Sequence, residues 1–376
     1  MKLSPFLLDQ WLEQKYSADS RIEYDLAAST GPVWTVRQLL ALAGQSEFDE
    51  KLLDTAISYT SGTGSRELRE AIASLENVDA DHVQVLTGAA EALLILFFVA
   101  AEPGANVVLS APGFPTNMAL ADSFGIEVRR YTLRPENEFR IDLDEIRALV
   151  DRNTRFVLVN SPQNPTGAVL IDQEMESLHD FCAARGVQFI SDEVYHPIYH
   201  GSETRSAARL PHATVLGDFS KALCLSGLRI GWVIERDPKR RELYTNARTY
   251  FTASNTALSE RLAVLALQHR EEIYGRARRI AGDNLKLLDR IFAEHVDVLR
   301  WVRPRGGMTA FPWLTAGGGS REFCRSLAQR GVLVAPGDCF GMPSHFRLGF
   351  AASGERFGAA MDRVAEFLSS SIAQLT

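Results

Sequence analysis

Five polar residues follow short apolar stretches of the sequence, at points where strands of a sheet would end. They are Asn164, Asp192, Tyr195, Lys221 and Arg229. A lysine amine can bond covalently to a carbonyl carbon and, once its pKa is lowered, can also move a proton. An arginine can bind a phosphate, and amide, phenol and carboxylate groups can hold the polar atoms of a ring. Together these residue types match the needs of a phosphate-bearing aldehyde cofactor.

Each of these features also has a purely structural explanation. Asn-Pro-Thr-Gly at 164–167 is a good turn, Asp-Glu can cap a helix, and a single lysine or arginine is usually solvated. Thr-Gly-Ala-Ala-Glu at 87–91 places small residues before a predicted helix, where free N–H groups could bind a phosphate. It matches neither the Walker loop nor the dinucleotide fingerprint. The combination, rather than any single member, favours a binding site.

The segments that must position these residues alternate between β-branched runs and helical stretches. Strands are predicted at 83–86, 107–109, 127–132, 156–159, 187–190, 213–216 and 228–234, and helices at 89–101, 116–124 and 173–185. This alternation predicts a largely parallel α/β sheet flanked by helices, with ligands at the carboxyl ends of its strands. After residue 234 the pattern is helical to about 295, and a mixed pattern follows, with strands expected at 298–302 and 309–314. We therefore expect a large domain at 46–270 and a smaller α+β domain formed by 1–45 and 271–376.

The order and spacing of these motifs resemble the class I/II aminotransferase family of fold-type-I pyridoxal-phosphate enzymes. The resemblance rests on the Asn-Pro-Thr-Gly at 164–167, on Asp192 and Tyr195, and on Ser-Lys followed by an arginine eight residues later. It spans nearly the whole chain. It implies pyridoxal 5′-phosphate as cofactor, a seven-stranded type of sheet, and Lys221, Asp192 and Tyr195 as catalytic residues.

The resemblance assigns a role to each residue near the cofactor ring. Lys221 would form a Schiff base with the cofactor and move a proton between the substrate Cα and the cofactor. Asp192 would pair with the ring nitrogen and keep it protonated. Tyr195 and Asn164 would hydrogen-bond the phenolic oxygen of the ring. Phe114, in Ala-Pro-Gly-Phe-Pro, would stack on the ring face, with a core phenylalanine as the alternative.

The phosphate of the cofactor would lie between the start of one helix and the lysine segment. The residues that the resemblance places there are Gly88, Ala89, Ala90, Ser220 and Arg229. One position departs from the family pattern, because Asp218 stands three residues before the lysine, where Ser or Thr is usual. An ionised carboxylate repels a phosphate, so Asp218 either turns away or changes how the phosphate is held.

Three further residues match family positions away from the cofactor ring. Tyr59, in Tyr-x4-Gly-x3-Leu-Arg, matches a tyrosine that reaches the phosphate of a neighbouring subunit, which implies a homodimer with shared sites. Arg347 matches the arginine that grips the substrate α-carboxylate, together with Asn164. Gly31 matches a loop that closes over the substrate, although a plain turn explains it nearly as well.

The reaction is less constrained than the cofactor, because one scaffold supports several outcomes. We predict transfer of an α-amino group from an amino acid to a 2-oxo acid by a ping-pong route. The segments 8–16 and 304–312 are also similar to capreomycidine synthases, which cyclise a hydroxylated arginine after elimination. A decarboxylase, a lyase and a non-enzymatic cofactor-binding domain are further alternatives.

Composition excludes several other classes. The formal charge of −7, with no basic block, argues against general nucleic-acid binding. No apolar run approaches the roughly 20 residues of a membrane helix. The cysteines Cys182, Cys224, Cys324 and Cys339 are too far apart for a disulfide framework or zinc site, which favours reduced thiols and a cytoplasmic location. We predict no metal at His196 and His200, because Pro197 disrupts a helical face.

Overall fold

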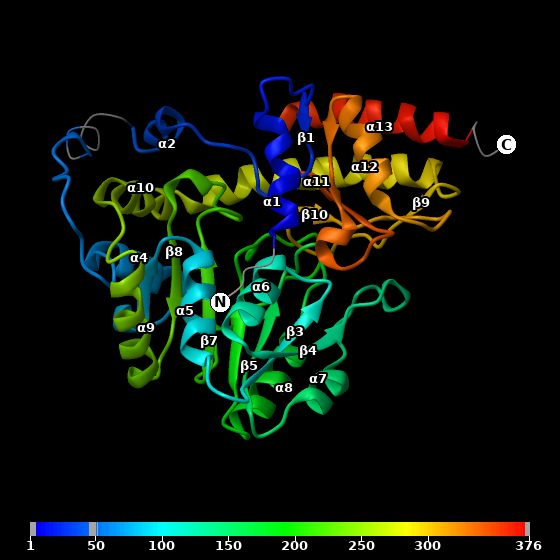
Figure 1. The fold of residues 1–376 in the computed structure, drawn as a ribbon. Helices are drawn as coiled ribbons and strands as arrows, with labels where there is room; N and C mark the ends of the chain where they lie inside the picture. The colour runs from blue at the N-terminus through cyan, green and yellow to red at the C-terminus, as the bar shows by residue number, and fades with distance from the viewer. Residues whose placement is uncertain (1–4, 45–49, 51, 373–376) are drawn as a thin grey trace.

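The computed structural model describes residues 5–44, 50 and 52–372. At its centre is a seven-stranded sheet in the order β2-β8-β7-β6-β5-β3-β4 (Figure 1). Its strands are β2 (Val83–Leu86), β3 (Asn106–Ala111), β4 (Glu127–Thr132), β5 (Thr154–Asn160), β6 (Gln188–Asp192), β7 (Ala213–Asp218) and β8 (Gly231–Ile234). Only β8 runs antiparallel to its two neighbours. The predicted α/β class, with a largely parallel sheet flanked by helices, is confirmed.

Alternate residues of the strands enter two apolar clusters, one on each face of the sheet. On β5, Phe156 and Leu158 belong to one cluster, and Val157 and Val159 belong to the other. The first face is covered by α5 (Ala89–Ala100), α6 (Pro115–Phe124) and α9 (Pro238–Phe251). The second is covered by α4 (Arg66–Glu76), α7 (Leu143–Leu149), α8 (Asp172–Ala183) and α10 (Ala257–Gln268). Burial on both faces explains why inner strands such as β3, β7 and β8 are largely apolar, whereas the edge strand β4 is charged and only partly buried.

A second group of elements combines segments from the two ends of the chain. Its helices are α1 (Leu7–Leu12), α11 (Arg270–Glu294), α12 (Ser320–Gln329) and α13 (Phe357–Ile372), and α2 (Val36–Leu42) follows the N-terminal part. Its short strands include β1 (Tyr24–Asp25), β12 (Val332–Leu333), β13 (Ala335–Pro336) and β14 (Phe346–Gly349). β1 pairs in parallel with β12, so the two chain ends lie side by side, blue beside orange and red in Figure 1. The predicted boundary at 45 and 46 falls outside the described residues, and the one at 270 stays a prediction.

Some predicted strands are shorter in the structure. The strand predicted at 228–234 begins only at Gly231, because Arg229 has a φ of 51°, a left-handed conformation that a strand cannot contain. The predicted strands at 298–302 and 309–314 are reduced to β9 (Leu299–Arg300), β10 (Thr309–Ala310) and β11 (Trp313–Leu314). Pro304 and Pro312 have no backbone N–H for a strand ladder, so they interrupt this region.

Two observations bear on the environment of the protein. Within the described residues, no helix combines the length and the apolar character needed to cross a membrane. The four cysteines are free and buried. The cytoplasmic location stays a prediction.

Candidate active site

A cavity of about 250 Å³ lies at the carboxyl ends of β5, β6 and β7, between these strand ends and the start of α5. Its lining includes Ala89, Ala90, Phe114, Asn160, Asn164, Asp192, Tyr195, Asp218, Ser220, Lys221 and Arg229. The structure therefore brings together most of the cofactor residues predicted from the sequence. The sheet explains this arrangement, since parallel strands end at one edge and their following residues converge there.

Lys221 lies three residues beyond the end of β7, and its amine is held within the cavity. Its Nζ donates a hydrogen bond to the Ser29 hydroxyl at 3.1 Å. Burial lowers the pKa of Lys221 to about 8, and the nearby carboxylate of Asp218 opposes this shift. About a tenth of the amine is therefore neutral at pH 7, far more than at the ordinary lysine pKa, and only the neutral amine can act as a nucleophile or a proton acceptor.

Asp192 is the last residue of β6 and is buried. Burial raises its pKa to about 7, and the neighbouring charges of Asp218 and Glu193 act in the same direction. The hydrogen bond from the Val194 N–H, at 3.3 Å, opposes this rise. A carboxylate in this position favours a cationic partner, such as a protonated ring nitrogen, that would restore its charged form.

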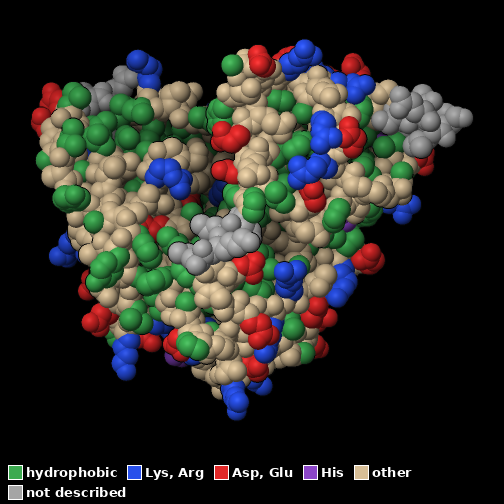
Figure 2. All heavy atoms as spheres, viewed as in Figure 1, with side chains coloured by type: hydrophobic (Ala, Val, Ile, Leu, Met, Phe, Trp, Pro, Cys, Tyr) green, Lys and Arg blue, Asp and Glu red, His purple; other side chains and the backbone are tan. Residues whose placement is uncertain are grey.

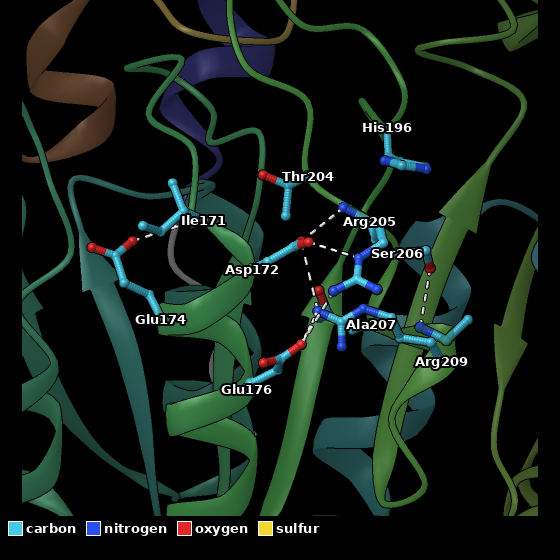
Figure 3. A network of polar contacts seen from close by, with 12 residues as sticks. Ile171, Asp172, Glu174, Glu176, His196, Thr204, Arg205, Ser206, Ala207 and Arg209 are labelled. Carbon is cyan, nitrogen blue, oxygen red and sulfur yellow. Dashed lines mark hydrogen bonds and ion pairs between the residues drawn. The ribbon is translucent and has the colours of Figure 1, made fainter.

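The segment behind Asp192 is fixed by a polar network. The Glu193 carboxylate accepts hydrogen bonds at 2.8 Å from the Ser191 hydroxyl and from the Ala207 N–H. Ala207 follows Arg205, which forms a 2.7 Å ion pair with Asp172 at the start of α8 (Figure 3). The network anchors the loop after β6 to α8, and this loop in turn holds the residue next to Asp192.

Arg347, on β14, is buried and lies against Asn164. Its Nη1 donates to the Asn164 side-chain oxygen at 3.1 Å, and its Nη2 donates to the Ala27 carbonyl at 2.7 Å. Its Nε is buried without a hydrogen-bond partner. A buried guanidinium with an unused donor is costly unless an anion completes it, so this position suits a carboxylate ligand.

Tyr195 and Asn164 are positioned by backbone and side-chain contacts. The Tyr195 hydroxyl donates to the Ser29 carbonyl at 2.9 Å, and burial raises the pKa of Tyr195 to about 12. The Asn164 N–H donates to the side-chain oxygen of Asn160 at 2.7 Å, while the Asn160 amide donates to the Asp192 carbonyl at 3.0 Å. Asn160 thus connects the turn after β5 to the end of β6.

The opposite end of the cavity contains the predicted phosphate residues. Gly88 has a φ of +80°, and a Cβ there would lie 2.5 Å from Nη2 of Arg229, so only glycine fits. Arg229 donates to the Ser220 hydroxyl at 3.2 Å. The departure at Asp218 has a structural consequence, because its carboxylate accepts the Ala89 N–H at 2.7 Å. Asp218 therefore faces this end of the cavity and does not turn away.

The remaining predicted residues lie around the cavity. Phe114 lines it and meets Phe6 edge to face, with ring centroids 6.3 Å apart. Gly31 packs against the turn after Lys221, where an added Cβ would come within 2.2 Å of the Cys224 sulfur. Tyr59 is 89% exposed and is not among the residues lining the cavity of its own chain.

Sequence reasoning missed two residues of the site. Ser29 contacts both Lys221 and Tyr195, yet nothing in its local sequence distinguishes it from a turn serine. Asn160 does carry a signal in the sequence, because it is a polar residue at the end of an otherwise apolar strand. Of the two histidines considered as metal ligands, His196 contacts the Tyr199 hydroxyl and His200 contacts the Gly307 carbonyl. No cluster of three or more His, Cys, Asp or Glu suited to a metal occurs among the described residues.

The donor set fits pyridoxal 5′-phosphate at both ends of the cavity. An amine with a lowered pKa and a buried carboxylate lie at one end, at Lys221 and Asp192. The glycine cradle at Gly88 and the guanidinium of Arg229 lie at the other end. A small aldehyde with a ring nitrogen and a phosphate would have a complementary group for each of its polar parts.

Comparison with known proteins gives consistent results. Residues 33–366 match the family model for aminotransferase class I and II. Capreomycidine synthase from Streptomyces vinaceus is 32% identical, with 92% of this chain and 88% of that protein covered. Arginine–pyruvate transaminase from Pseudomonas aeruginosa is also 32% identical, with coverages of 87% and 89%. A pyridoxal-phosphate-dependent aminotransferase structure from Streptococcus suis has a TM-score of 0.91 at 28% identity, with coverages of 98% and 99%.

These matches confirm the resemblance found in the sequence, including the similarity to capreomycidine synthase. They cover most of each relative, so they concern the whole fold and not one shared motif. The protein is an enzyme with pyridoxal 5′-phosphate as its cofactor, and it belongs to the aminotransferase class I and II family.

Proposed function

We propose that the enzyme transfers the α-amino group of an amino acid to a 2-oxo acid in two half-reactions that share one site. The observation that carries this proposal is the placement of Lys221 and Asp192 in one cavity, with Arg347 hydrogen-bonded to Asn164 in the cavity lining. Lys221 has a pKa lowered to about 8, Asp192 is buried, and Arg347 has an unused buried donor. A proton-transfer group, a ring-nitrogen partner and a carboxylate anchor are the minimum set for this chemistry.

Each side chain has a specific task in this proposal. When bound, pyridoxal 5′-phosphate supplies an electron sink that stabilises negative charge at the substrate Cα. Lys221 would hold the cofactor through its aldehyde and, once released, would move the proton from the substrate Cα to the former aldehyde carbon, as amino transfer requires. Arg347 binds the α-carboxylate with its fork and so fixes the orientation of the bonds at Cα. Asn164, 3.1 Å from Arg347, holds that fork in position.

We also propose that the active unit is a homodimer. Tyr59 and Ile57 are 89% and 93% exposed, although large apolar side chains are costly to leave in water. Figure 2 shows hydrophobic side chains gathered on the left of the view, where Figure 1 places α2 and the segment leading to α4. Mixing Lys221→Ala chains with Tyr59→Ala chains tests for shared sites, since a mixed dimer would regain one intact site and therefore some activity.

The spectrum of the purified protein tests the role of Lys221. We expect a yellow chromophore that survives dialysis and that borohydride fixes to Lys221, with loss of both properties in Lys221→Ala. Lys239→Ala is the matched control, because Lys239 is exposed at the start of α9. A Lys221→Ala protein that retains a borohydride-fixed cofactor would contradict this assignment.

A single half-reaction then tests transamination. An amino acid added without any acceptor should change the spectrum once and yield an equal amount of 2-oxo acid, and a 2-oxo acid should reverse the change. Continuous release of ammonia, or a cyclic product without an acceptor, would reject the transaminase assignment. The same absorbance change identifies the substrate, because a panel of amino acids can be screened one by one.

The second candidate is elimination followed by ring closure, as suggested by the 32% identity to capreomycidine synthase. Within the described residues lining the cavity, the only carboxylates are Asp192 and Asp218. Both lie at proposed cofactor positions. The guanidinium group of an arginine substrate would therefore need an acidic partner from outside this cavity lining. Incubation with a β-hydroxylated arginine, followed by mass analysis for loss of water, distinguishes this reaction from transamination.

A further inference from the structure

Asp218 links the two segments that form the phosphate end of the cavity. It is the last residue of β7, lies three residues before Lys221 and is only 6% exposed. Its Oδ2 accepts the Ala89 N–H at 2.7 Å, and its Oδ1 accepts the Ser220 N–H. Ala89 begins α5, so one carboxylate connects the end of β7 to the start of that helix. The hydrogen bonds use both carboxylate oxygens.

The carboxylate lies where an anion is favoured. The first N–H groups of α5, which is 12 residues long, have no partner within the helix, and the helix dipole is positive at this end. A Cβ placed on Gly88 would lie 2.5 Å from Nη2 of Arg229 and 3.3 Å from Oδ2 of Asp218. The guanidinium and the carboxylate thus approach the same point above Gly88. This is the position in which the backbone amides and Arg229 would jointly bind a phosphate.

We propose that Asp218 is an internal stand-in for the cofactor phosphate. Its carboxylate keeps this end of the cavity formed in the cofactor-free chain, and the phosphate must compete with it for the Ala89 N–H. The inference rests on the cofactor residues given under Proposed function and does not depend on which reaction follows. A hydroxyl at position 218 would donate to the phosphate, whereas the carboxylate places a like charge beside it.

Two opposite consequences follow for binding and for stability. Removing the carboxylate should strengthen binding of the phosphate, because a competitor and a repulsive charge are lost together. The same change should weaken the cofactor-free protein, because the buried Ala89 and Ser220 N–H groups lose their acceptor. A residue that merely stabilises the fold would cause the second effect without the first.

Titration of the cofactor-free protein with pyridoxal 5′-phosphate, and separately with pyridoxal, tests the proposal. Pyridoxal has the same aldehyde and ring but no phosphate. For Asp218→Ser we expect Kd for pyridoxal 5′-phosphate to fall by about tenfold or more, because a like charge at hydrogen-bond range is removed. The titrations are run at about pH 9, above the pKa of Lys221, so that its amine is mostly neutral with or without the charge of Asp218. Under these conditions Kd for pyridoxal should change by less than about twofold, because pyridoxal has no phosphate to compete with Asp218. Asp144→Asn, whose side chain is 88% exposed on α7, is the charge-removal control.

Thermal melting provides the second measurement. Cofactor-free Asp218→Ser should melt below wild type, and pyridoxal 5′-phosphate should raise its melting temperature more than it raises that of wild type. Inorganic phosphate alone should also raise the melting temperature of Asp218→Ser more than it raises that of wild type. If Asp218→Ser does not fold, Asp218→Asn keeps one acceptor without the charge and should show the same directions, with smaller changes.

Three results would overturn the proposal. The first is an Asp218 variant whose affinity for pyridoxal 5′-phosphate is unchanged or weaker. The second is an equal gain in affinity for pyridoxal, and the third is a cofactor-free variant that melts at the same temperature as wild type. None of these measurements uses an amino-acid substrate. A wrong assignment of the reaction would therefore leave the titration intact, and failure of the titration would leave transamination untouched.

Discussion

The two sides of the cavity are built in different ways. Asp192 and Lys221 stand at or just after the ends of adjacent strands, so hydrogen bonds between β6 and β7 fix their separation. Arg347 and Ser29 come from segments that lie far apart in the sequence; short backbone links join these segments at Leu26, which bonds to Leu333 and Gly349, and Ser29 itself contacts Lys221 and Tyr195. The sheet side is fixed by a long backbone ladder, and the chain-end side, which carries Arg347 and Ser29, combines short strand pairs with a few specific side chains. Single substitutions should therefore reposition the chain-end side more readily.

The largest effect should come from Arg347, the central residue of the chain-end side. Arg347→Ala removes a buried fork that donates to Asn164 and to the Ala27 carbonyl. We expect kcat/KM for the amino acid to fall by about 10³-fold, because losing a buried charged partner costs roughly 4 kcal/mol. Arg347→Lys should recover only part of this, since an ammonium has no planar fork.

A substrate analogue shows whether this loss concerns the carboxylate. A primary amine without a carboxylate should react equally slowly with wild type and Arg347→Ala. Arg303→Ala, a half-exposed arginine paired with Asp289, serves as the control for loss of positive charge. If kcat/KM for the amine also falls a thousandfold in Arg347→Ala, Arg347 supports the fold of the site and does not bind the carboxylate.

Gly31 should give the next largest effect. Gly31→Ala places a Cβ within 2.2 Å of the Cys224 sulfur, which must displace the segment that carries Ser29. A shift of about 1 Å at a catalytic group reduces kcat/KM by about 100-fold. Adding Cys224→Gly should restore most of the activity, because it removes the sulfur and suits the φ of 59° at that position.

Gly201→Ala is the control for this pair. A Cβ at Gly201 would meet no atom within 4 Å, so its activity should match wild type. If kcat/KM of the double variant Gly31→Ala/Cys224→Gly is no higher than that of Gly31→Ala, the limiting contact is Met308, whose Cε lies 3.1 Å from the added Cβ. The clash with Cys224 would then not explain the loss.

The same contrast explains what could be predicted from the sequence. The strands up to β7 and the residues that follow them were predicted, because local periodicity and short motifs determine both. Ser29 was missed because its role arises from contacts with Lys221 and Tyr195, 192 and 166 residues away. The start of β8 was placed too early, since apolar residues at 228 and 230 hide the left-handed backbone of Arg229. The competition of Asp218 for the Ala89 N–H also required three-dimensional contacts.

The pH dependence of cofactor incorporation tests the sheet side. Only neutral Lys221 can attack the aldehyde, and its pKa is lowered from 10.5 to about 8. The rate should therefore rise by about tenfold per pH unit below 8 and level off above it. Asp218 is the strongest of the charges that raise this pKa, so Asp218→Asn should move the midpoint to lower pH. A midpoint near 10 in wild type would show that Lys221 is not desolvated.

The smallest effect should come from the network behind Asp192, where the sheet side meets a surface loop. Asp172→Asn weakens the ion pair with Arg205, whose side chain is 66% exposed, so we expect a loss of about 1 kcal/mol or less in unfolding free energy. The loop keeps its other anchors, which are the Ala207 N–H to Glu193 and the 2.9 Å pair of Arg209 with Glu176 (Figure 3). Asp192 should therefore stay in place, and kcat/KM should remain within about twofold of wild type. Urea unfolding and steady-state kinetics on the same preparation check both expectations. A fall in kcat/KM above tenfold at unchanged stability would mean that the sheet side also depends on single side-chain contacts, because the strand ladder alone would then be insufficient to hold Asp192.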